Sequence, residues 1–325
     1  MQYKYLGKTG LKVSSLCLGT MTYGNQVNKE EATNIIARAL EAGINFFDTA
    51  DAYADGNSEE IVGKALKKER QSVILATKVA SRTGSGVNDI GLSRQHIIKG
   101  IEDSLRRLAT DYIDIYYVHW PDYNTPIEET LQTLNDLVHQ GKIRYIGCSN
   151  FRAWQLCKAL WVSDINKLTS FTCIQPPYNL LTRDIEYELL PLCVSEGIGV
   201  CVYNPLAAGL LTGKYDPDKP PTEGTRFNIE GMGSLYRERY WSNANFQAVS
   251  NLKEIARKYD RNLIQFALAW ILSNDTITSA ICGTTSLNQL EENLRATELK
   301  LSEEELIECD NVWQQLRPLR FFYGR

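Results

Sequence analysis

Four side chains that could cooperate in proton transfer each follow a short apolar run. Asp48 ends the run Ile44–Phe47, and Tyr53 follows five residues later in a loop of small and polar residues. Lys78 and His119 follow two later runs of the same kind. An abrupt change from apolar to charged residues is typical of a buried parallel strand at its C-terminal end. We therefore expect all four side chains to lie at or just beyond strand ends.

Together these side chains suit the donation of a proton to a carbonyl oxygen that becomes an alkoxide. A phenol has an ordinary pKa of about 10 and is a poor acid at neutral pH. The ammonium of Lys78 favours the phenolate of Tyr53 and lowers that pKa, while the carboxylate of Asp48 keeps the lysine charged and in place. A neutral His119 imidazole can orient the substrate oxygen. No side chain supplies two electrons, so a hydride donor must come from outside the chain.

Other interpretations of the same residues stay open at this point. Asp48 can cap a loop, Tyr53 can lie on the surface, and His119 can be a hydrogen-bonded core histidine. Lys78 can be a solvated lysine at a strand end, or it can form a Schiff base with a carbonyl substrate, as in an aldolase. A metal site has few ligands available, because the chain has three histidines and its eight cysteines form no C-x-x-C pair.

The elements that must position these residues alternate along the chain. Eight short apolar runs are separated by amphipathic segments such as Lys29–Ala42 and Arg94–Leu108. The runs are Ser15–Leu18, Ile44–Phe47, Ser72–Thr77, Tyr112–Val118, Ile143–Gly147, Phe171–Ile174, Ile198–Val202 and Ser279–Cys282. Eight strand-and-helix units predict a parallel sheet closed into an α/β (β/α)8 TIM barrel. The rival, an open doubly wound sheet, predicts a G-x-G-x-x-G turn that GTMTYGN lacks.

Three segments fall outside the alternation. Residues 2–13 read as an N-terminal hairpin, Leu211–Trp241 as a long loop after the seventh strand, and Ser302–Arg325 as an extra C-terminal helix and tail. We expect one domain over residues 1–325, with Ser58 capping the helix Ile61–Lys68.

Composition excludes several classes of function. The net charge is -4, and lysines and arginines do not cluster, so a nucleic-acid partner is not expected. The longest apolar run, Leu263–Leu272, is too short to span a bilayer, so no membrane partner is expected either. Met1–Gly10 shows no signal-peptide pattern, and the scattered cysteines are typical of buried free thiols. These features predict a cytoplasmic location. The oligomeric state cannot be inferred.

Several ordered motifs resemble the aldo-keto reductases. They are Asp48-Thr49-Ala50 with Tyr53 and Gly56-x-Ser58-Glu59, then Lys78, then Gly141-Lys142-x-Arg144-x-Ile146-Gly147-x-Ser149-Asn150. The segment Tyr203-x-Pro205-Leu206-x-x-Gly209-x-Leu211-x-Gly213-Lys214 is similar to the branch of bacterial oxidoreductases and potassium-channel β-subunits. The resemblance covers nearly the whole chain. It implies a barrel that binds NADP(H) without a Rossmann motif, with Asp48, Tyr53, Lys78 and His119 as the catalytic tetrad.

The resemblance also implies a set of cofactor-binding positions. Ser149, Asn150 and Gln175 match the residues that hold the nicotinamide carboxamide, and Tyr203 matches the aromatic residue on which that ring stacks. The further positions are Gly19, Thr20, Met21 and Asp48 at the first two strand ends, Asn204, Pro205, Leu206, Ala207, Gly209 and Lys214 near the pyrophosphate, and Gly283, Thr285, Gln289, Glu292 and Asn293 at the adenosine.

The preferred nucleotide is less directly implied. No basic residue occurs from Thr284 to Asn293 to bind a 2′-phosphate, although threonine hydroxyls and helix N-terminal amides can do so. Arg226 in the long loop is our candidate for that contact. We expect NADP(H) from the family's habit, with NAD(H) as the alternative, and we expect the loop Leu211–Trp241 to fold over the pyrophosphate as a lid.

Two functions of different classes follow from the resemblance. The first is an NADP(H)-dependent oxidoreductase that reduces aldehyde or ketone carbonyls, with Tyr53 as the general acid. The second is a nucleotide-binding, redox-sensing regulatory subunit of the channel β-subunit type. The sequence does not name the small-molecule substrate, because specificity depends on variable loops.

Overall fold

The computed structural model describes residues 1–229 and 233–317, and these divide into two compact units. The first unit comprises Met1–Pro177, Asp184–Tyr203 and Asp275–Leu294. The second comprises Tyr178–Arg183, Asn204–Asn274 and the segment that begins at Arg295. The single domain expected over residues 1–325 stays a prediction.

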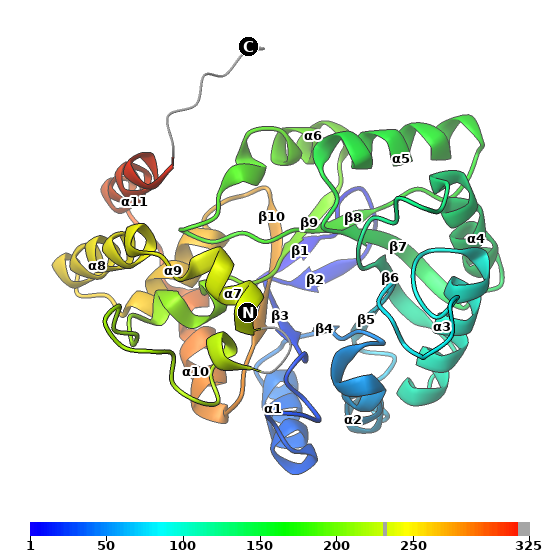
Figure 1. The fold of residues 1–325 in the computed structure, drawn as a ribbon, viewed down its shortest axis with the longest axis horizontal. Coiled ribbons are helices and arrows are strands. Elements are labelled where there is room, and N and C mark those ends of the chain that lie inside the picture. The colour runs from blue at the N-terminus through cyan, green and yellow to red at the C-terminus, as the bar shows by residue number, and fades with distance from the viewer. Residues whose placement is uncertain (230–232, 318–325) are drawn as a thin grey trace. The chain divides into compact units, whose positions relative to one another are not determined.

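The first unit contains a closed barrel of eight parallel strands (Figure 1). The order around the barrel is β3-β4-β5-β6-β7-β8-β9-β10, with β10 pairing back onto β3. The strands are β3 Leu16–Gly19, β4 Phe46–Asp48, β5 Ile74–Val79, β6 Ile113–Val118, β7 Ile143–Ser149, β8 Cys173–Gln175, β9 Gly199–Val202 and β10 Ile277–Gly283. Each corresponds to one predicted run, so the (β/α)8 barrel is confirmed.

The strands of the barrel are buried on both faces. All six residues of β6 are buried, as expected for a parallel strand that has side chains packed on either side of it. Inside the barrel, Phe46, Ile115, Tyr117 and Cys201 belong to one hydrophobic cluster. All eight cysteines are free, and seven of them are buried. The expectation of buried thiols therefore holds for every cysteine except Cys157.

Helices of the first unit follow the strands in the chain. They are α1 Lys29–Glu41, α2 Asn57–Leu66, α3 Arg94–Leu108, α4 Ile127–His139, α5 Ala153–Ile165, α6 Leu189–Glu196 and α10 Leu287–Arg295. Ser93 caps α3, because its Oγ accepts a hydrogen bond from the His96 amide at 3.3 Å. Ser58 does not cap α2. The helix begins at Asn57 with Gly56 at the N-cap, and the Ser58 hydroxyl points inward.

The N-terminal hairpin is also present, as β1 Tyr3–Tyr5 paired antiparallel with β2 Lys12–Ser14. Leu6 and Val13 extend the hydrophobic cluster of the barrel from this hairpin. Gly7 has a φ of 56°, and a Cβ added there would lie 2.5 Å from the carbonyl oxygen of Gly197. Glycine is therefore required at position 7, where the hairpin packs against the start of β9.

The second unit is largely helical. Its helices are α7 Gly233–Tyr240, α8 Asn243–Lys258, α9 Leu263–Leu272 and α11 Glu303–Leu316. The extra C-terminal helix is confirmed as α11, which begins with a capping box between Ser302 and Glu305. The predicted tail, residues 318–325, lies outside the described residues. The helices α8 and α9 were not predicted as such, because the apolar run in α9 was considered only for its length.

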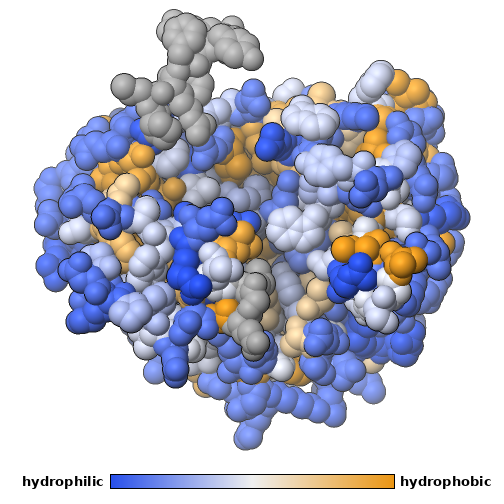
Figure 2. Space-filling view, viewed as in Figure 1, coloured by the Kyte–Doolittle hydropathy of each residue, from blue (hydrophilic) through white to orange (hydrophobic). Residues whose placement is uncertain are grey.

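The surface is mainly polar. Figure 2 shows one face on which hydrophilic side chains predominate and hydrophobic patches are small. Among the described residues, no helix is long and apolar enough to cross a membrane.

Candidate active site

The centre of the candidate site is a fully buried lysine at the end of β5. The Lys78 ammonium donates to Asp48 Oδ1 at 2.5 Å and to the Thr49 carbonyl at 2.7 Å. It also lies 3.2 Å from the Tyr53 hydroxyl. Three strand-end residues that the sequence grouped together, Asp48, Tyr53 and Lys78, are therefore in direct contact.

The loop between β4 and α2 places Tyr53 over this lysine. Ala54 and Asp55 have φ values of 48° and 53°, so the chain turns tightly just after the tyrosine. A cluster of buried hydroxyls fixes the loop from below. Ser58 Oγ lies 2.9 Å from Thr20 Oγ1 and 3.0 Å from Thr49 Oγ1. The serine expected to be a helix cap instead ties the end of β3 to the end of β4.

Charge in this pocket favours the ammonium form of the lysine. Burial alone would lower the pKa of Lys78, but the carboxylate of Asp48 and the Tyr53 hydroxyl outweigh burial and raise that pKa above its usual value. Gln175 Nε2 donates to the other oxygen of Asp48 at 2.8 Å, so both carboxylate oxygens have partners. A buried charge pair of this kind is stable only when its remaining hydrogen-bonding groups are satisfied.

His119 lies beside the tyrosine and is kept neutral. Its ring centroid is 6.0 Å from that of Tyr53, and the Trp120 ring stacks on its other side at 5.2 Å. Burial, and then the positive charge of Lys78, hold the pKa of His119 well below its ordinary value. Its Nδ1 is buried and has no hydrogen-bond partner among the described residues. An uncharged imidazole beside a phenol can bind a carbonyl oxygen as a hydrogen-bond donor from its other nitrogen.

Trp120 was not among the predicted site residues. It remains 39% exposed although it stacks directly on His119. The only feature of the sequence that points to Trp120 as a site residue is its position next to His119.

Hydrogen bonds join the predicted nicotinamide-binding residues of β7, β8 and β9. The Ser149 hydroxyl donates to the Gln175 carbonyl at 2.8 Å, and the Tyr203 hydroxyl donates to Asn150 Oδ1 at 2.8 Å. Asn150 has a φ of 61°, and its amide donates to the His119 carbonyl at 3.0 Å. Asn150, in a left-handed conformation that asparagine tolerates, thus links this group to His119.

Beneath the loop lies a second buried network that the sequence did not reveal. Glu59 is fully buried, accepts a hydrogen bond from the Thr77 hydroxyl at 2.5 Å and pairs with Arg107 at 2.7 Å. Thr77 directly precedes Lys78 in β5. The network therefore fixes α2 and α3 against β5, the strand that contains Lys78. No local pattern predicts it, because its members are distant in the chain.

Asp51, between Asp48 and Tyr53, is the other buried acid near the site. Both of its carboxyl oxygens are buried without a hydrogen-bond partner among the described residues. Burial, and then the negative charge of Glu59, raise the pKa of Asp51 to about 8. The group is therefore a neutral carboxylic acid at pH 7, which avoids the free-energy cost of an unpaired buried charge.

The other predicted cofactor positions of the first unit lie at strand ends and on α10. Gly19 ends β3. The hydroxyl of Thr20, the next residue, donates to the Asp48 carbonyl at 3.0 Å, and Met21 is half-buried beside it. A Cβ added at Gly19 would lie 2.8 Å from Ile281, so the close approach of β10 requires glycine there.

At the end of β10, the adenosine-site prediction falls on an exposed turn. Gly283 is exposed, and the Thr285 amide donates to Gln289 Oε1 at 2.9 Å in the first turn of α10. Glu292 is half-buried and Asn293 is buried one turn further on. These side chains give a polar surface without a cation from residue 284 to residue 293.

The predicted pyrophosphate positions lie in the second unit and form a distinctive backbone turn. Asn204, Ala207, Ala208 and Gly209 all have positive φ values, from 49° to 97°. Asn204 Oδ1 accepts the Ala208 amide at 2.8 Å, while Pro205 is buried and Leu206 half-buried within the turn. The Ala207 and Gly209 amides also donate within the turn, to the Asn204 carbonyl at 3.0 Å and the Leu206 carbonyl at 2.8 Å.

Two cations of the second unit approach the same aromatic side chain. Lys214 is exposed, and its ammonium lies 5.1 Å from the centroid of the Tyr215 ring. Arg226 is half-buried and interacts electrostatically with the same tyrosine. The positive charge of Arg226 is thus felt at the Tyr215 hydroxyl, whose ring the Lys214 ammonium approaches.

The long loop that contains these cations is partly anchored. Tyr215, Phe227, Trp241 and Phe246 pack edge to face, with ring centroids 4.9 to 5.5 Å apart. Phe227 is fully buried. Of the four glycines in the loop, Gly213 and Gly224 have positive φ values, Gly233 begins α7, and Gly231 lies outside the described residues.

With fold and site described, comparison with known proteins identifies the family. The model of the aldo/keto reductase family matches residues 15–314, and the chain belongs to that family. It is 41% identical over 304 residues to a protein of Arabidopsis thaliana named "Probable voltage-gated potassium channel subunit beta", covering 92% of each chain. A protein of Oryza sativa subsp. japonica with the same name is 39% identical over 326 residues, covering 98% of each chain.

Proposed function

We propose that this protein is an NADP(H)-dependent oxidoreductase that reduces aldehyde or ketone carbonyls to alcohols. The observation that carries the proposal is the contact of the Lys78 ammonium with both Asp48 and the Tyr53 hydroxyl, beside a neutral His119. Family membership supports the reaction class, since this group of side chains occurs at the strand ends, where barrel enzymes place their sites.

Three side chains would act one after another on a bound carbonyl compound. His119 donates a hydrogen bond to the carbonyl oxygen and orients it toward the Tyr53 hydroxyl. As the carbonyl carbon is reduced, the oxygen takes the hydroxyl proton of Tyr53 and the product leaves as an alcohol. The phenolate left behind is stabilised by the ammonium of Lys78, which Asp48 keeps charged.

The side chains present fit a nicotinamide cofactor. The Ser149 hydroxyl and the Asn150 amide can bind a carboxamide, and the half-buried ring of Tyr203, held by its bond to Asn150, offers a stacking face. When bound, NADPH supplies the hydride that no side chain can provide.

A Schiff-base aldolase is not supported by the surroundings of Lys78. A lysine nucleophile must lose its proton, whereas the contacts with Asp48 and Tyr53 raise the pKa of Lys78. Borohydride treatment in the presence of an aldehyde substrate tests the point, because an aldolase would retain substrate covalently attached to this lysine.

A regulatory role is the second candidate, and the names of the relatives favour it. Both relatives described above are named as potassium channel β-subunits. In this case the protein would bind the nucleotide and report its redox state to a partner. Substrate turnover and the regulatory role are compatible, since the same site would bind the nucleotide in both.

The decisive experiment is a fluorescence titration of the purified protein with NADPH and NADH, followed by NADPH oxidation with a panel of aldehydes and ketones. Saturable NADPH binding and turnover that Tyr53→Phe abolishes would support the reductase. Tight binding with no turnover on any carbonyl would favour the regulatory subunit. We also propose a cytoplasmic location, for which the eight unpaired cysteines are the supporting observation.

A further inference from the structure

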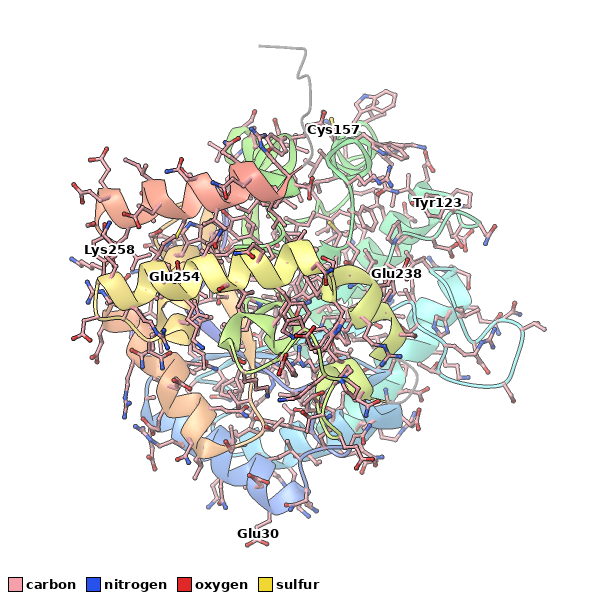
Figure 3. All side chains as sticks on the ribbon, turned by 60° about the vertical axis from the view of Figure 1, so that its left-hand side comes forward. Glu30, Tyr123, Cys157, Glu238, Glu254 and Lys258 are labelled. Carbon is pink, nitrogen blue, oxygen red and sulfur yellow. The ribbon has the colours of Figure 1, made fainter. Side chains whose placement is uncertain are left out.

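A hollow in the first unit lies between the loop that follows β6 and the first two turns of α5. Its volume is about 360 Å³, which is within the range of small-molecule sites. Leu92, Thr130 and Phe151 contribute buried side chains to its lining, and Tyr123 and Trp154 contribute exposed aromatic rings. Figure 3 labels Tyr123, on the loop that leads into α4. We call this hollow the Tyr123 pocket.

Hydrogen bonds within the protein fix the walls of the pocket. The Asp122 carboxylate accepts from the Leu92 amide at 2.8 Å and from the Thr125 hydroxyl at 2.7 Å, so it is already used inside the loop. From α5, Gln155 Nε2 donates to the Tyr123 hydroxyl at 3.1 Å. Because these walls are in place before a ligand arrives, little conformational freedom is lost when one binds.

The two aromatic rings at the edge of the pocket are not covered by the protein. Tyr123 is 77% exposed and Trp154 is 59% exposed. Among the residues that the structure describes, neither ring packs against another aromatic ring or a cation. The face of an aromatic ring is electron-rich and attracts C–H groups, and covering it also removes apolar area from water. The rings therefore fit a ligand that has a face of C–H groups.

Polar side chains with no partner of their own line the same pocket. They are Asn124, Glu128 and Lys158, all of them exposed, and within the described part of the chain none of the three side chains forms a hydrogen bond or ion pair. The amide and ammonium nitrogens donate hydrogen bonds, whereas the carboxylate accepts them. The charges of Glu128 and Lys158 cancel, which favours a neutral ligand. A hydroxyl group suits this mixture, because it donates and accepts at once.

We propose that the Tyr123 pocket binds a neutral sugar in its pyranose form. The C–H face of the sugar lies against the Trp154 ring, and its hydroxyls bond the Glu128 carboxylate and the Lys158 ammonium. A planar aromatic ligand would cover the rings but would leave both charged groups without a partner. The proposal does not rest on the proposed reductase function, because no residue of the catalytic tetrad lines the pocket.

The test uses the methyl pyranosides of glucose, galactose and mannose. These glycosides cannot open to an aldehyde, so they cannot be reduced at the candidate active site. The six tryptophans are replaced by 5-fluorotryptophan, and the ¹⁹F signal of Trp154 is assigned by its absence in Trp154→Phe. At least one glycoside should shift this signal saturably, with a dissociation constant of about 0.1 to 10 mM.

A matched pair of variants separates the pocket from the rest of α5. Trp154→Ala should weaken binding about tenfold, because it removes the ring on which the sugar stacks. Trp161→Ala should bind like the wild type, since Trp161 is 62% exposed on the same helix but does not line the pocket. Saturation-transfer NMR of the glycoside measures both variants, because Trp154→Ala lacks the fluorine signal.

Glu128→Gln tests the polar side of the pocket. The amide keeps the shape of the carboxylate but cannot form a charge-assisted hydrogen bond with a sugar hydroxyl, so binding should weaken about tenfold. Circular dichroism and thermal unfolding would establish that each variant is folded. All of these measurements are made without nucleotide, so a failure of the reductase assignment would not affect them.

Three results would overturn the proposal. The first is the absence of a saturable shift with every glycoside up to about 100 mM. The second is an unchanged affinity in folded Trp154→Ala and Glu128→Gln, or an equal loss in Trp161→Ala, which would place the sugar elsewhere. The third is a Trp154 signal that responds to benzoate or to a proline-rich peptide and to none of the glycosides, which would assign the pocket to another class of ligand.

Discussion

The Lys78 ammonium lies 2.5 Å from Asp48 Oδ1, and both side chains are almost completely removed from water. Removing either partner would leave the other as an uncompensated buried charge, which destabilises proteins strongly. The pair is therefore both a structural element and the electrostatic setting of Tyr53. Variants of Lys78 or Asp48 must therefore be tested for folding before their activity is interpreted.

Tyr53→Phe is expected to abolish carbonyl reduction while leaving NADPH affinity nearly unchanged. The substitution removes only the proton donor, whose loss should lower the rate by about 10² to 10⁴. Steady-state kinetics and a fluorescence titration on the same preparation give both quantities. Tyr116→Phe is the matched control, because that hydroxyl is buried in the barrel wall without a partner among the described residues. Wild-type turnover in Tyr53→Phe would end the assignment of the general acid.

Lys78→Met should lower the rate and also shift its dependence on pH. Without the ammonium, the pKa of the Tyr53 phenol rises toward its reference value of about 10. The pH at which activity declines on the alkaline side should therefore move upward. Because the variant leaves Asp48 without its cation, Lys78→Met combined with Asp48→Asn is the appropriate companion. A residual activity with the wild-type pH profile would mean that Lys78 does not tune the tyrosine.

Asp51→Asn should stabilise the protein near neutral pH. The pKa of Asp51 is raised from 3.8 to about 8 in the folded protein, so between these pH values the native state holds a proton that the unfolded chain has released. The free energy of unfolding then falls as pH rises through this range, by at most about 1.4 kcal/mol per pH unit from this group. Because asparagine cannot ionise, the variant does not lose this part of the free energy of unfolding as pH rises.

Denaturant unfolding of the wild type and Asp51→Asn at pH 5 and pH 8 isolates the contribution of this group. The stability difference between the two proteins should grow in favour of the variant as pH increases. A difference that does not change with pH would show that the Asp51 carboxyl is already ionised in the folded protein.

Arg226→Ala tests how the nucleotide is chosen. If this guanidinium binds the 2′-phosphate, NADPH loses a charge-assisted contact worth roughly 1.5 to 3 kcal/mol, or about ten- to a hundredfold in affinity. NADH binding should hardly change. Both dissociation constants are measured at one ionic strength, since salt screens the contact.

Other outcomes for Arg226→Ala are equally informative, with Arg257→Ala as the control for removal of a surface cation. Little change for either nucleotide would assign the phosphate to Thr284, Thr285 and the amides at the start of α10. An equal loss for both nucleotides would place the arginine on the shared pyrophosphate.

The loop Leu211–Trp241 should become protected from proteolysis when NADPH binds. Lys214 is exposed within it and is followed by Tyr215, so it offers a trypsin site, whereas Lys167, on the first unit, is also exposed and provides an internal reference. Protection of the loop relative to the reference site would support a cofactor-ordered lid. Equal cleavage with and without nucleotide would count against it.

The fold could be predicted because its signal is repeated along the chain. Eight apolar runs and the absence of a dinucleotide-binding turn sufficed for the closed barrel, and the barrel in turn places strand-end residues at one face. Asp48, Tyr53 and Lys78 were grouped correctly for that reason. The proposed nicotinamide contacts depended on the resemblance to a family instead.

Tertiary contacts account for what could not be predicted. Ser58 matches a capping pattern with Glu59 and Glu60, yet its hydroxyl bonds Thr20, which is 38 positions away in the chain. The pairing of Glu59 with Arg107 spans 48 positions. Local sequence contains no information about such partners, since they are brought together only when neighbouring strands and helices pack.

Closure of the barrel has a consequence for how the chain folds. The Ser279 hydroxyl donates to the Ser14 carbonyl, 265 positions earlier, where β10 completes the barrel beside β3. During synthesis, β3 through β9 emerge before their final neighbour exists, and they expose two unpaired parallel edges until it arrives. Such long-range pairing folds slowly and is prone to aggregation. Truncation before residue 277 should therefore yield an insoluble or chaperone-bound chain.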